Sequence, residues 1–190
     1  TNGHQNTSGV DHYEGGWSWS SVEMKAEGQT QGVVIDNSSG TIVISDDGFG
    51  NVDTATSIEG FFLTEFEDSF LGGGKVPSDP SLLPMWQQQF NTWLPYANVV
   101  DYEVVHGRGG NDNLDGGIGY DELVYGSSQT SLTIDLENSS QEDGLGYTDT
   151  IANFEGVEGT NYNDVIKGNA SDNGLDGALG NNTIDGRGGV

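Results

Sequence analysis

The chain has 190 residues, with 30 acidic and 5 basic side chains and a formal charge of −25. Such an excess of acid opposes compaction unless cations neutralise it, and it argues against nucleic acid or anionic membranes as partners, because both attract basic surfaces. The absence of cysteine excludes disulfides and thiolate metal sites, while a hydrophobic content of 33% suits a solenoid with a narrow interior better than one thick core.

The first part of the chain is expected to be a chemically degraded copy of a unit that recurs later. Gly9–Gly16 (GVDHYEGG) aligns with Gly110–Gly117 (GNDNLDGG), which places Asp11 on Asp112. In the following turn, Ser20 stands where the later copy has an acid. A neutral hydroxyl replaces a carboxylate poorly as a cation ligand, so we expect the first copy to hold fewer ions.

Both copies contain a longer segment that departs from the repeating turns, which we call the excursion. Asp47–Thr54 (DGFGNVDT) aligns with Asp143–Thr150 (DGLGYTDT), and we interpret the excursions as widened circuits with a protruding loop. Asp53 and Asp149 are either additional oxygen ligands there or solvated surface acids. Alternating runs predict strands within the excursions at Gly32–Asp36, Thr41–Ser45 and Ser131–Glu137.

The segment between the two copies has a different composition. Pro80–Val100 contains no charged residue, and its apolar side chains recur at helical spacing between Pro84 and Pro95. A short helical insertion is therefore expected around 82–95. It either packs across the rest of the chain or presents an exposed anchor for a protein partner or a polysaccharide; the anchor residues would be Trp86, Phe90 and Trp93.

A nine-residue period follows the insertion. Gly107–Asp115 reads GRGGNDNLD, and Gly116–Val124 (GGIGYDELV) fits G-G-x-G-x-D-x-aliphatic-x at every constrained position. Residues 159–167, 168–176 and 177–185 continue the period with more drift. Glycine permits backbone angles that turn carbonyl oxygens inward, and the acid completes an oxygen cage of the kind that Ca²⁺ prefers.

The aliphatic position of each turn predicts a very short strand with one inward side chain. Two in-phase columns result, made of Val105, Leu114 and Leu123 and of Val157, Ile166, Leu175 and Ile184. Two turns of nine complete one circuit, so residues 18 positions apart should share a side and an ion. The expected facing pairs are Glu103 with Asp121, Glu155 with Asn173, and Asp164 with Asn182. Thr130 stands at the position that would face Asp112, so Asp112 is expected to lack a ligand partner in the next circuit.

The pattern resembles the calcium-binding nonapeptide of the repeats-in-toxin (RTX, hemolysin-type) family. The resemblance is specific over 107–124, weaker over 159–185, and rests on the internal repeat over residues 1–106. It implies an all-β fold, namely a parallel β-roll (a β-helix-like solenoid) with bound calcium, to which the short helical insertion expected from the spacing is added. It also implies a secreted bacterial protein that leaves the cell unfolded by type I secretion and folds in extracellular calcium.

Three regions are expected: a first, degenerate roll unit at 1–73, an insertion or linker at 74–102, and a second roll unit at 103–190 that is truncated at its C-terminal end. No run of about 18 or more apolar residues occurs, so no transmembrane segment is predicted. The chain begins at Thr1 without a signal-like segment, and the sequence GRGGV at 186–190 stops in mid-turn. We therefore expect a fragment of a longer protein.

Calcium is the expected cofactor, with carboxylates, amides and turn carbonyls as ligands. The candidate metal residues are Asp11, Glu59, Asp68, Glu103, Arg108, Gly110, Asp112, Gly117, Gly119, Asp121, Glu155, Asp164, Asn173 and Asn182.

No nucleophile with a base and no phosphate-binding loop occurs, so no catalytic residue is predicted. The expected function is a calcium-binding structural, adhesive or partner-docking module at or outside the cell surface. The alternative is a calcium-binding appendage of a secreted protease, lipase or polysaccharide-modifying enzyme. Flanking sequence would distinguish the two, through further copies of the unit or a catalytic signature.

Overall fold

The computed structural model describes residues 2–5, 12–14, 20–39, 41–56, 58–73 and 102–189. Every regular element in these ranges is a β-strand, so the expected all-β class is confirmed. The helix expected around 82–95 lies outside the described residues, as do Asp11, Trp86, Phe90 and Trp93.

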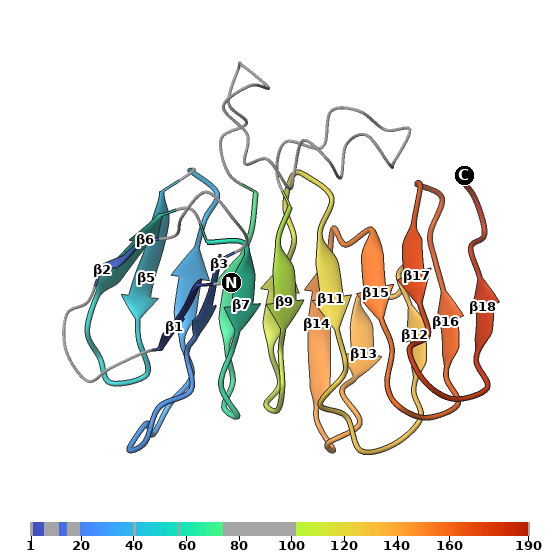
Figure 1. Ribbon diagram of the computed structural model, residues 1–190, viewed down its shortest axis with the longest axis horizontal. Helices are drawn as coiled ribbons and strands as arrows, with labels where there is room; N and C mark the ends of the chain where they lie inside the picture. The colour runs from blue at the N-terminus through green and yellow to red at the C-terminus, as the bar shows by residue number, and fades with distance from the viewer. Residues whose placement is uncertain are drawn as a thin grey trace.

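One face of the molecule is a sheet of parallel strands that follow one another along its long axis (Figure 1). Most of these strands have only three residues, because each is one short side of a coil. In spatial order they are β1 (Asn2–Gln5), β3 (Ser20–Glu23), β7 (Gly60–Phe62), β9 (Val104–His106), β11 (Glu122–Val124), β15 (Gly156–Glu158) and β17 (Gly174–Asp176).

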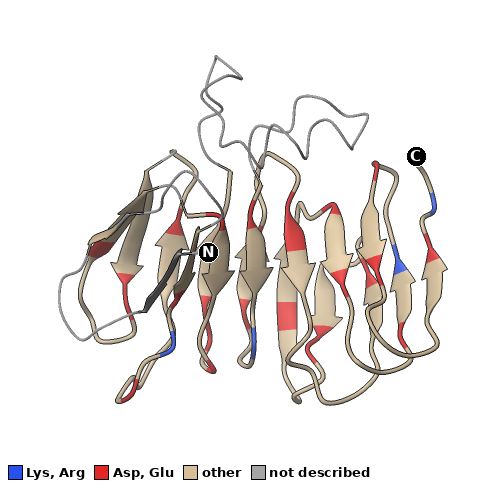
Figure 2. Cartoon of the chain, viewed as in Figure 1, with Lys and Arg blue, Asp and Glu red and all other residues tan. Residues whose placement is uncertain are grey.

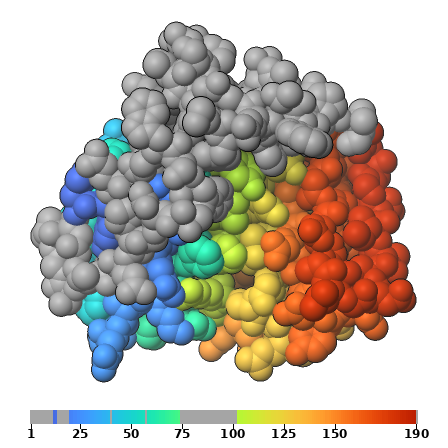
Figure 3. All heavy atoms as spheres, viewed as in Figure 1, coloured from blue at the N-terminus to red at the C-terminus, as the bar shows by residue number. Residues whose placement is uncertain are grey.

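The opposite face consists of two sheets. In spatial order the larger contains β13 (Ser140–Glu142), β14 (Thr148–Ala152), β10 (Asn113–Asp115), β8 (Ser69–Leu71), β4 (Val34–Asp36), β5 (Ile42–Asp46), β6 (Asp53–Thr56) and β2 (His12–Glu14). The smaller contains β12 (Thr133–Asp135), β16 (Val165–Lys167) and β18 (Thr183–Asp185). In the space-filling view the coils succeed one another from blue to red (Figure 3).

The register confirms the 18-residue circuit. Leu123 pairs with Val105, and Ile166 pairs with Ile184. Leu114, nine positions from both Val105 and Leu123, lies in the opposite sheet, where it pairs with other residues. Each column predicted from the nine-residue phase therefore alternates between two facing sheets, as expected when two turns make one circuit.

The excursions differ from the parallel coils. β4 and β5 are antiparallel, as are β5 and β6, and as are β13 and β14. The strands predicted from alternation are present as β4, β5 and β12. Their inward side chains, Ile35, Ile44 and Ile134, are completely or nearly completely buried. These antiparallel pairs are additions to a sheet that is otherwise parallel, whereas β12 pairs in parallel with β16 in the smaller sheet.

The core is a thin layer between the facing sheets. Phe61 and Phe70 are fully buried, with ring centroids 4.8 Å apart, and Leu114 and Leu123 continue the two rows. Each such side chain contributes about 1.5–3 kcal/mol on burial. The row becomes more exposed toward the C-terminus, where Ile184 is 48% exposed, so the apolar layer is least covered at that end of the roll.

Candidate metal site

Acidic side chains line the inside of the roll, immediately before its short strands. The backbone N–H of Glu103 donates to Asp121 Oδ1 (2.9 Å), and the N–H of Asp121 donates to Glu155 Oε2 (3.1 Å). Closer to the N-terminus, the N–H of Ser20 donates to Glu59 Oε2 (2.9 Å). Each acid therefore accepts a hydrogen bond from the preceding coil, and together these acids form an interior ladder.

The interior ladder also runs along the opposite side of the core. The N–H of Asp68 donates to Asp112 Oδ1 (2.9 Å), and the N–H of Asp112 donates to Asp149 Oδ1 (3.1 Å). The expectation that Asp112 loses its outer partner at Thr130 is wrong. The excursion returns to the roll at β14, whose register with β10 brings Asp149 beside Asp112.

Burial makes the charged form of the ladder acids unfavourable. Burial, reinforced by the neighbouring acids, raises the pKa of Asp112 to about 9. Burial and the adjacent Glu103 carboxyl raise the pKa of Asp121 far above its usual range. Burial raises the pKa of Glu59 to about 7 and that of Asp68 to about 6. Near neutral pH, the ladder therefore favours bound protons or bound cations.

Three ladder carboxylates each have one oxygen without a hydrogen-bond donor. These oxygens are Glu103 Oε2, Asp112 Oδ2 and Asp121 Oδ2, and all three residues are at most 2% exposed. The second oxygen of Glu103 accepts a hydrogen bond from Asn37 Nδ2 (2.5 Å). A buried polar atom without a partner costs about 1–3 kcal/mol, and more when charged, so these oxygens are where a cation would stabilise the fold most.

Two other ladder aspartates receive donors from threonines in their own turns. Thr160 donates its N–H to Asp164 Oδ2 (2.7 Å) and its hydroxyl to Asp164 Oδ1 (3.0 Å). Thr64 makes the equivalent bonds to Asp68, both at 2.8 Å. Threonine replaces the second glycine of the nonapeptide in both turns. The donors that these carboxylates need are therefore supplied within the turn.

The C-terminal turns use side-chain amides in the ladder. Asn182 Oδ1 accepts the N–H of Asp164 (2.8 Å), so the expected pairing of these residues is present. Asn182 Nδ2 donates to the carbonyls of Gly177 (2.6 Å) and Leu179 (3.1 Å). Asn173 Nδ2 likewise donates to two carbonyls of its own turn, at 3.3 and 2.5 Å. In both turns, an amide N–H group satisfies inward carbonyls that a cation could otherwise bind.

The turn residues expected to offer carbonyl oxygens have left-handed backbone angles. The φ values are 64° at Arg108, 122° at Gly110, 82° at Gly117 and 154° at Gly119. A Cβ on Gly110 would collide with the carbonyl of Phe66 in the adjacent coil, so glycine allows the coils to approach. The Arg108 guanidinium forms an ion pair with Glu23 (2.8 Å), which leaves its backbone carbonyl as the group that could contact a cation.

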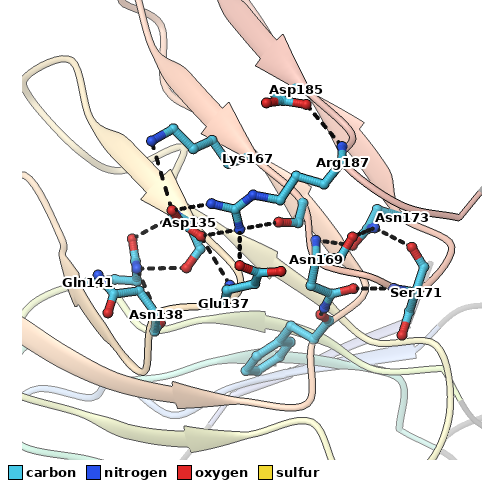
Figure 4. Close-up of polar contacts among 12 residues, drawn as sticks. Asp135, Glu137, Asn138, Gln141, Lys167, Asn169, Ser171, Asn173, Asp185 and Arg187 are labelled. Atoms are coloured by element: carbon cyan, nitrogen blue, oxygen red, sulfur yellow. Dashed lines mark hydrogen bonds and ion pairs between the residues drawn. The ribbon is translucent and has the colours of Figure 1, made fainter.

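A second arginine, in the equivalent position of the last turn, joins coils on the outside. Arg187 makes two bonds to the Asp135 carboxylate (2.6 and 2.7 Å) and an ion pair with Glu137 (3.1 Å), while Lys167 lies 3.9 Å from Asp135 (Figure 4). Figure 2 shows how few basic residues accompany the acids along the roll. These arginine contacts involve acids outside the interior ladder.

The sequence left the roles of Asp53 and Asp149 open and did not predict Thr64 and Thr160 as donors. Asp53 and Asp149 are buried, at 0% and 2% exposure, so their interpretation as solvated surface acids is wrong. A signal for Asp149 was present, because it stands two residues before the inward Ile151, as ladder acids do. The roles of Thr64 and Thr160 had no such signal, since each interrupts the glycine pattern.

Within the described ranges, no three His, Cys, Asp or Glu side chains gather as a group that could hold a metal ion. An ion at the interior ladder would therefore need backbone oxygens or water as well, as calcium sites commonly use. The described residues include no helix that is long and apolar enough to cross a membrane.

No protein-family model matches the chain, and no curated protein is significantly similar to it in sequence. Functional inference therefore depends on the side chains of the interior ladder and on their chemistry.

Proposed function

We propose that this chain is a calcium-binding β-roll module of the RTX type, which folds when it binds calcium. The observation that carries the proposal is the set of buried carboxylate oxygens without donors at Glu103, Asp112 and Asp121. Water does not reach these oxygens, so repulsion between charged neighbours is not relieved by solvent. A cation that binds only the folded chain would remove this cost and stabilise the fold.

Calcium fits the available donors better than a transition metal. The turns offer carboxylates and backbone carbonyls, and the chain contains no cysteine. Ca²⁺ accepts roughly 6 to 8 oxygen ligands in flexible geometry, which a glycine-rich turn provides more readily than it provides the imidazoles or thiolates that zinc and copper favour.

Calcium dependence suits a secreted bacterial protein. In low calcium, the repulsion among 30 acids keeps the chain unfolded, which is compatible with type I secretion. In extracellular calcium, the chain folds into a rod that serves a structural, adhesive or partner-docking role. The doubled unit supports a non-catalytic module of this kind over an appendage of an enzyme.

Circular dichroism of the whole chain in calcium and in excess chelator tests the proposal. We expect the strand signal to disappear on chelation and to return with added calcium, because each site contributes about 2.7 kcal/mol when calcium is at one hundred times its dissociation constant. Magnesium at equal ionic strength is the control and should restore less structure. Unchanged strand content in excess chelator would show that the proposal is wrong.

A further inference from the structure

The excursion of the second unit brings additional polar groups into the interior beside Asp112. Asp143 and Asp149 are each 2% exposed, and Tyr125 is 4% exposed. Asp143 precedes a tight loop and Asp149 lies in β14, so neither belongs to a nonapeptide turn. The excursion therefore adds two buried carboxyl groups to the interior beside that of Asp112.

These groups lie close to one another. The N–H of Asp112 donates to Asp149 Oδ1 (3.1 Å). The position that a Cβ on Gly107 would take is 3.0 Å from Asp112 Oδ2 and 3.8 Å from Asp149 Oδ2. Both oxygens therefore border the same space beside the glycine. Asp143 closes the hairpin of β13 and β14: its N–H donates to the carbonyl of Tyr147 (3.3 Å), two residues before Asp149.

Hydrogen bonding leaves part of this cluster unsatisfied. Asp143 Oδ1 accepts three backbone N–H groups of its own loop, at 2.8, 3.1 and 3.0 Å. Asp143 Oδ2, Asp112 Oδ2 and the Tyr125 hydroxyl have no partner, although all three are buried. No Lys or Arg in the described part of the chain forms an ion pair with Asp112, Asp143 or Asp149.

In the first unit, the corresponding loop supplies hydrogen-bond donors to both oxygens of its aspartate. Asp47 is the counterpart of Asp143, and its Oδ1 accepts the N–H groups of Phe49 and Asn51 (both 2.9 Å). Its second oxygen accepts a bond from Asn51 Nδ2 (3.0 Å). The second unit has Tyr147 at the position of Asn51. Loss of this amide leaves Asp143 Oδ2 without a donor.

We propose that Asp112, Asp143 and Asp149 bind a calcium ion inside the second unit at a site that the excursion creates. The inference rests on the proposed function but adds a site that the nonapeptide pattern does not predict. The three carboxylates do not form a closed metal centre by themselves. Backbone oxygens or water complete the shell, and the carboxylates draw together when the ion binds.

The test is the number of calcium ions bound per chain at saturation, measured by equilibrium dialysis of the full chain. Asp143→Asn keeps the oxygen that accepts the loop N–H groups but removes the charge, so we expect one ion fewer than in the unmodified chain. Tyr147→Asn changes a side chain of a 44% exposed residue and restores the amide that Asn51 supplies in the first unit. It should also lower the number by one.

Asp47→Asn is the matched control, because it makes the same change where the loop is already satisfied, and it should leave the number of ions unchanged. If Asp143→Asn does not fold, Tyr147→Asn decides the question. Unchanged stoichiometry in Tyr147→Asn, or an equal loss in Asp47→Asn, would reject this site while leaving calcium-dependent folding intact. Absence of calcium binding by the unmodified chain would reject both the site and the proposed function.

Discussion

The turns at 107–121 and those at 168–182 share one nine-residue period but close in different ways. In the first pair, Asp112 and Asp121 are buried and each retains an oxygen without a donor. In the second pair, Asn173 and Asn182 donate their amide N–H groups to carbonyls of their own turns. The same coil geometry therefore carries a buried carboxylate oxygen without a donor in one region and an amide that donates to the turn carbonyls in the other.

The comparison indicates that this coil geometry can form with or without a bound cation. A parallel coil requires that inward polar groups be paired, and either a cation between oxygens or an amide donor can achieve this. The threonine turns at Asp68 and Asp164 are a third solution, in which hydroxyl and backbone donors satisfy the carboxylate. We therefore expect calcium to concentrate in the central coils and not to be spread evenly over every repeat.

Replacing Asp121 should have the largest effect. Asp121→Ala removes a carboxylate from a turn with all its glycines, and we expect calcium affinity at that site to fall at least a hundredfold, or about 2.7 kcal/mol. Asn173→Ala and Asn182→Ala should leave affinity nearly unchanged and lower only stability. Isothermal titration calorimetry measures the difference. Equal losses of affinity in the three variants would contradict the distinction between the regions.

Acid should partly replace calcium in the central coils. In the metal-free folded chain, burial raises the pKa of Asp68 to about 6, of Asp149 to about 7 and of Asp112 to about 9. The folded state then binds more protons than the unfolded state, so stability falls as pH rises through this range.

Lowering the pH of metal-free protein from 8 to 5 should therefore increase the strand signal in circular dichroism. With calcium present the trend should weaken or reverse, because protons compete with the ion for the carboxylates. Metal-free protein that gains structure as the pH rises would contradict the assignment of these acids to the interior.

Converting an amide turn to an acid turn sharpens the comparison. Asn182→Asp loses two amide bonds to turn carbonyls, which should cost about 1–3 kcal/mol and move the calcium midpoint of folding to higher concentration. At saturating calcium the loss should be recovered. Asn181→Asp makes the same charge change on an exposed side chain of the adjacent residue and is the control. The prediction fails if the two variants show the same calcium midpoint.

The smallest expected effect concerns the threonine turns. Thr160→Val keeps the shape of the side chain but removes the hydroxyl that donates to Asp164 (3.0 Å). Backbone N–H groups still satisfy this carboxylate, so urea unfolding at saturating calcium should show a loss of about 0.5–1.5 kcal/mol. Thr183→Val, at an exposed strand position, should change stability by no more than about 0.5 kcal/mol. Similar values for the two variants would mean that the hydroxyl does not support the carboxylate.

The sequence alone determined the all-β class, the nine-residue coil and the 18-residue register, because every coil repeats one short-range pattern of glycine, acid and aliphatic residue. Val105 and Leu123 therefore pair as the spacing predicts. The ladder positions of Glu103 and Asp121 follow from the same phase. Local spacing is sufficient when each element contacts only the next coil.

Only the tertiary structure decided which oxygens are left without donors. Asp149 lies beside Asp112 in place of Thr130, because the antiparallel excursion rejoins the sheet there. The nine-residue period does not encode how many residues the excursion contains before it rejoins the sheet. The donors to Asp68 and Asp164 come from threonines that break the repeat. Hydrogen-bond partners between coils depend on three-dimensional contacts, so residues with the same place in the repeat acquire different chemistry.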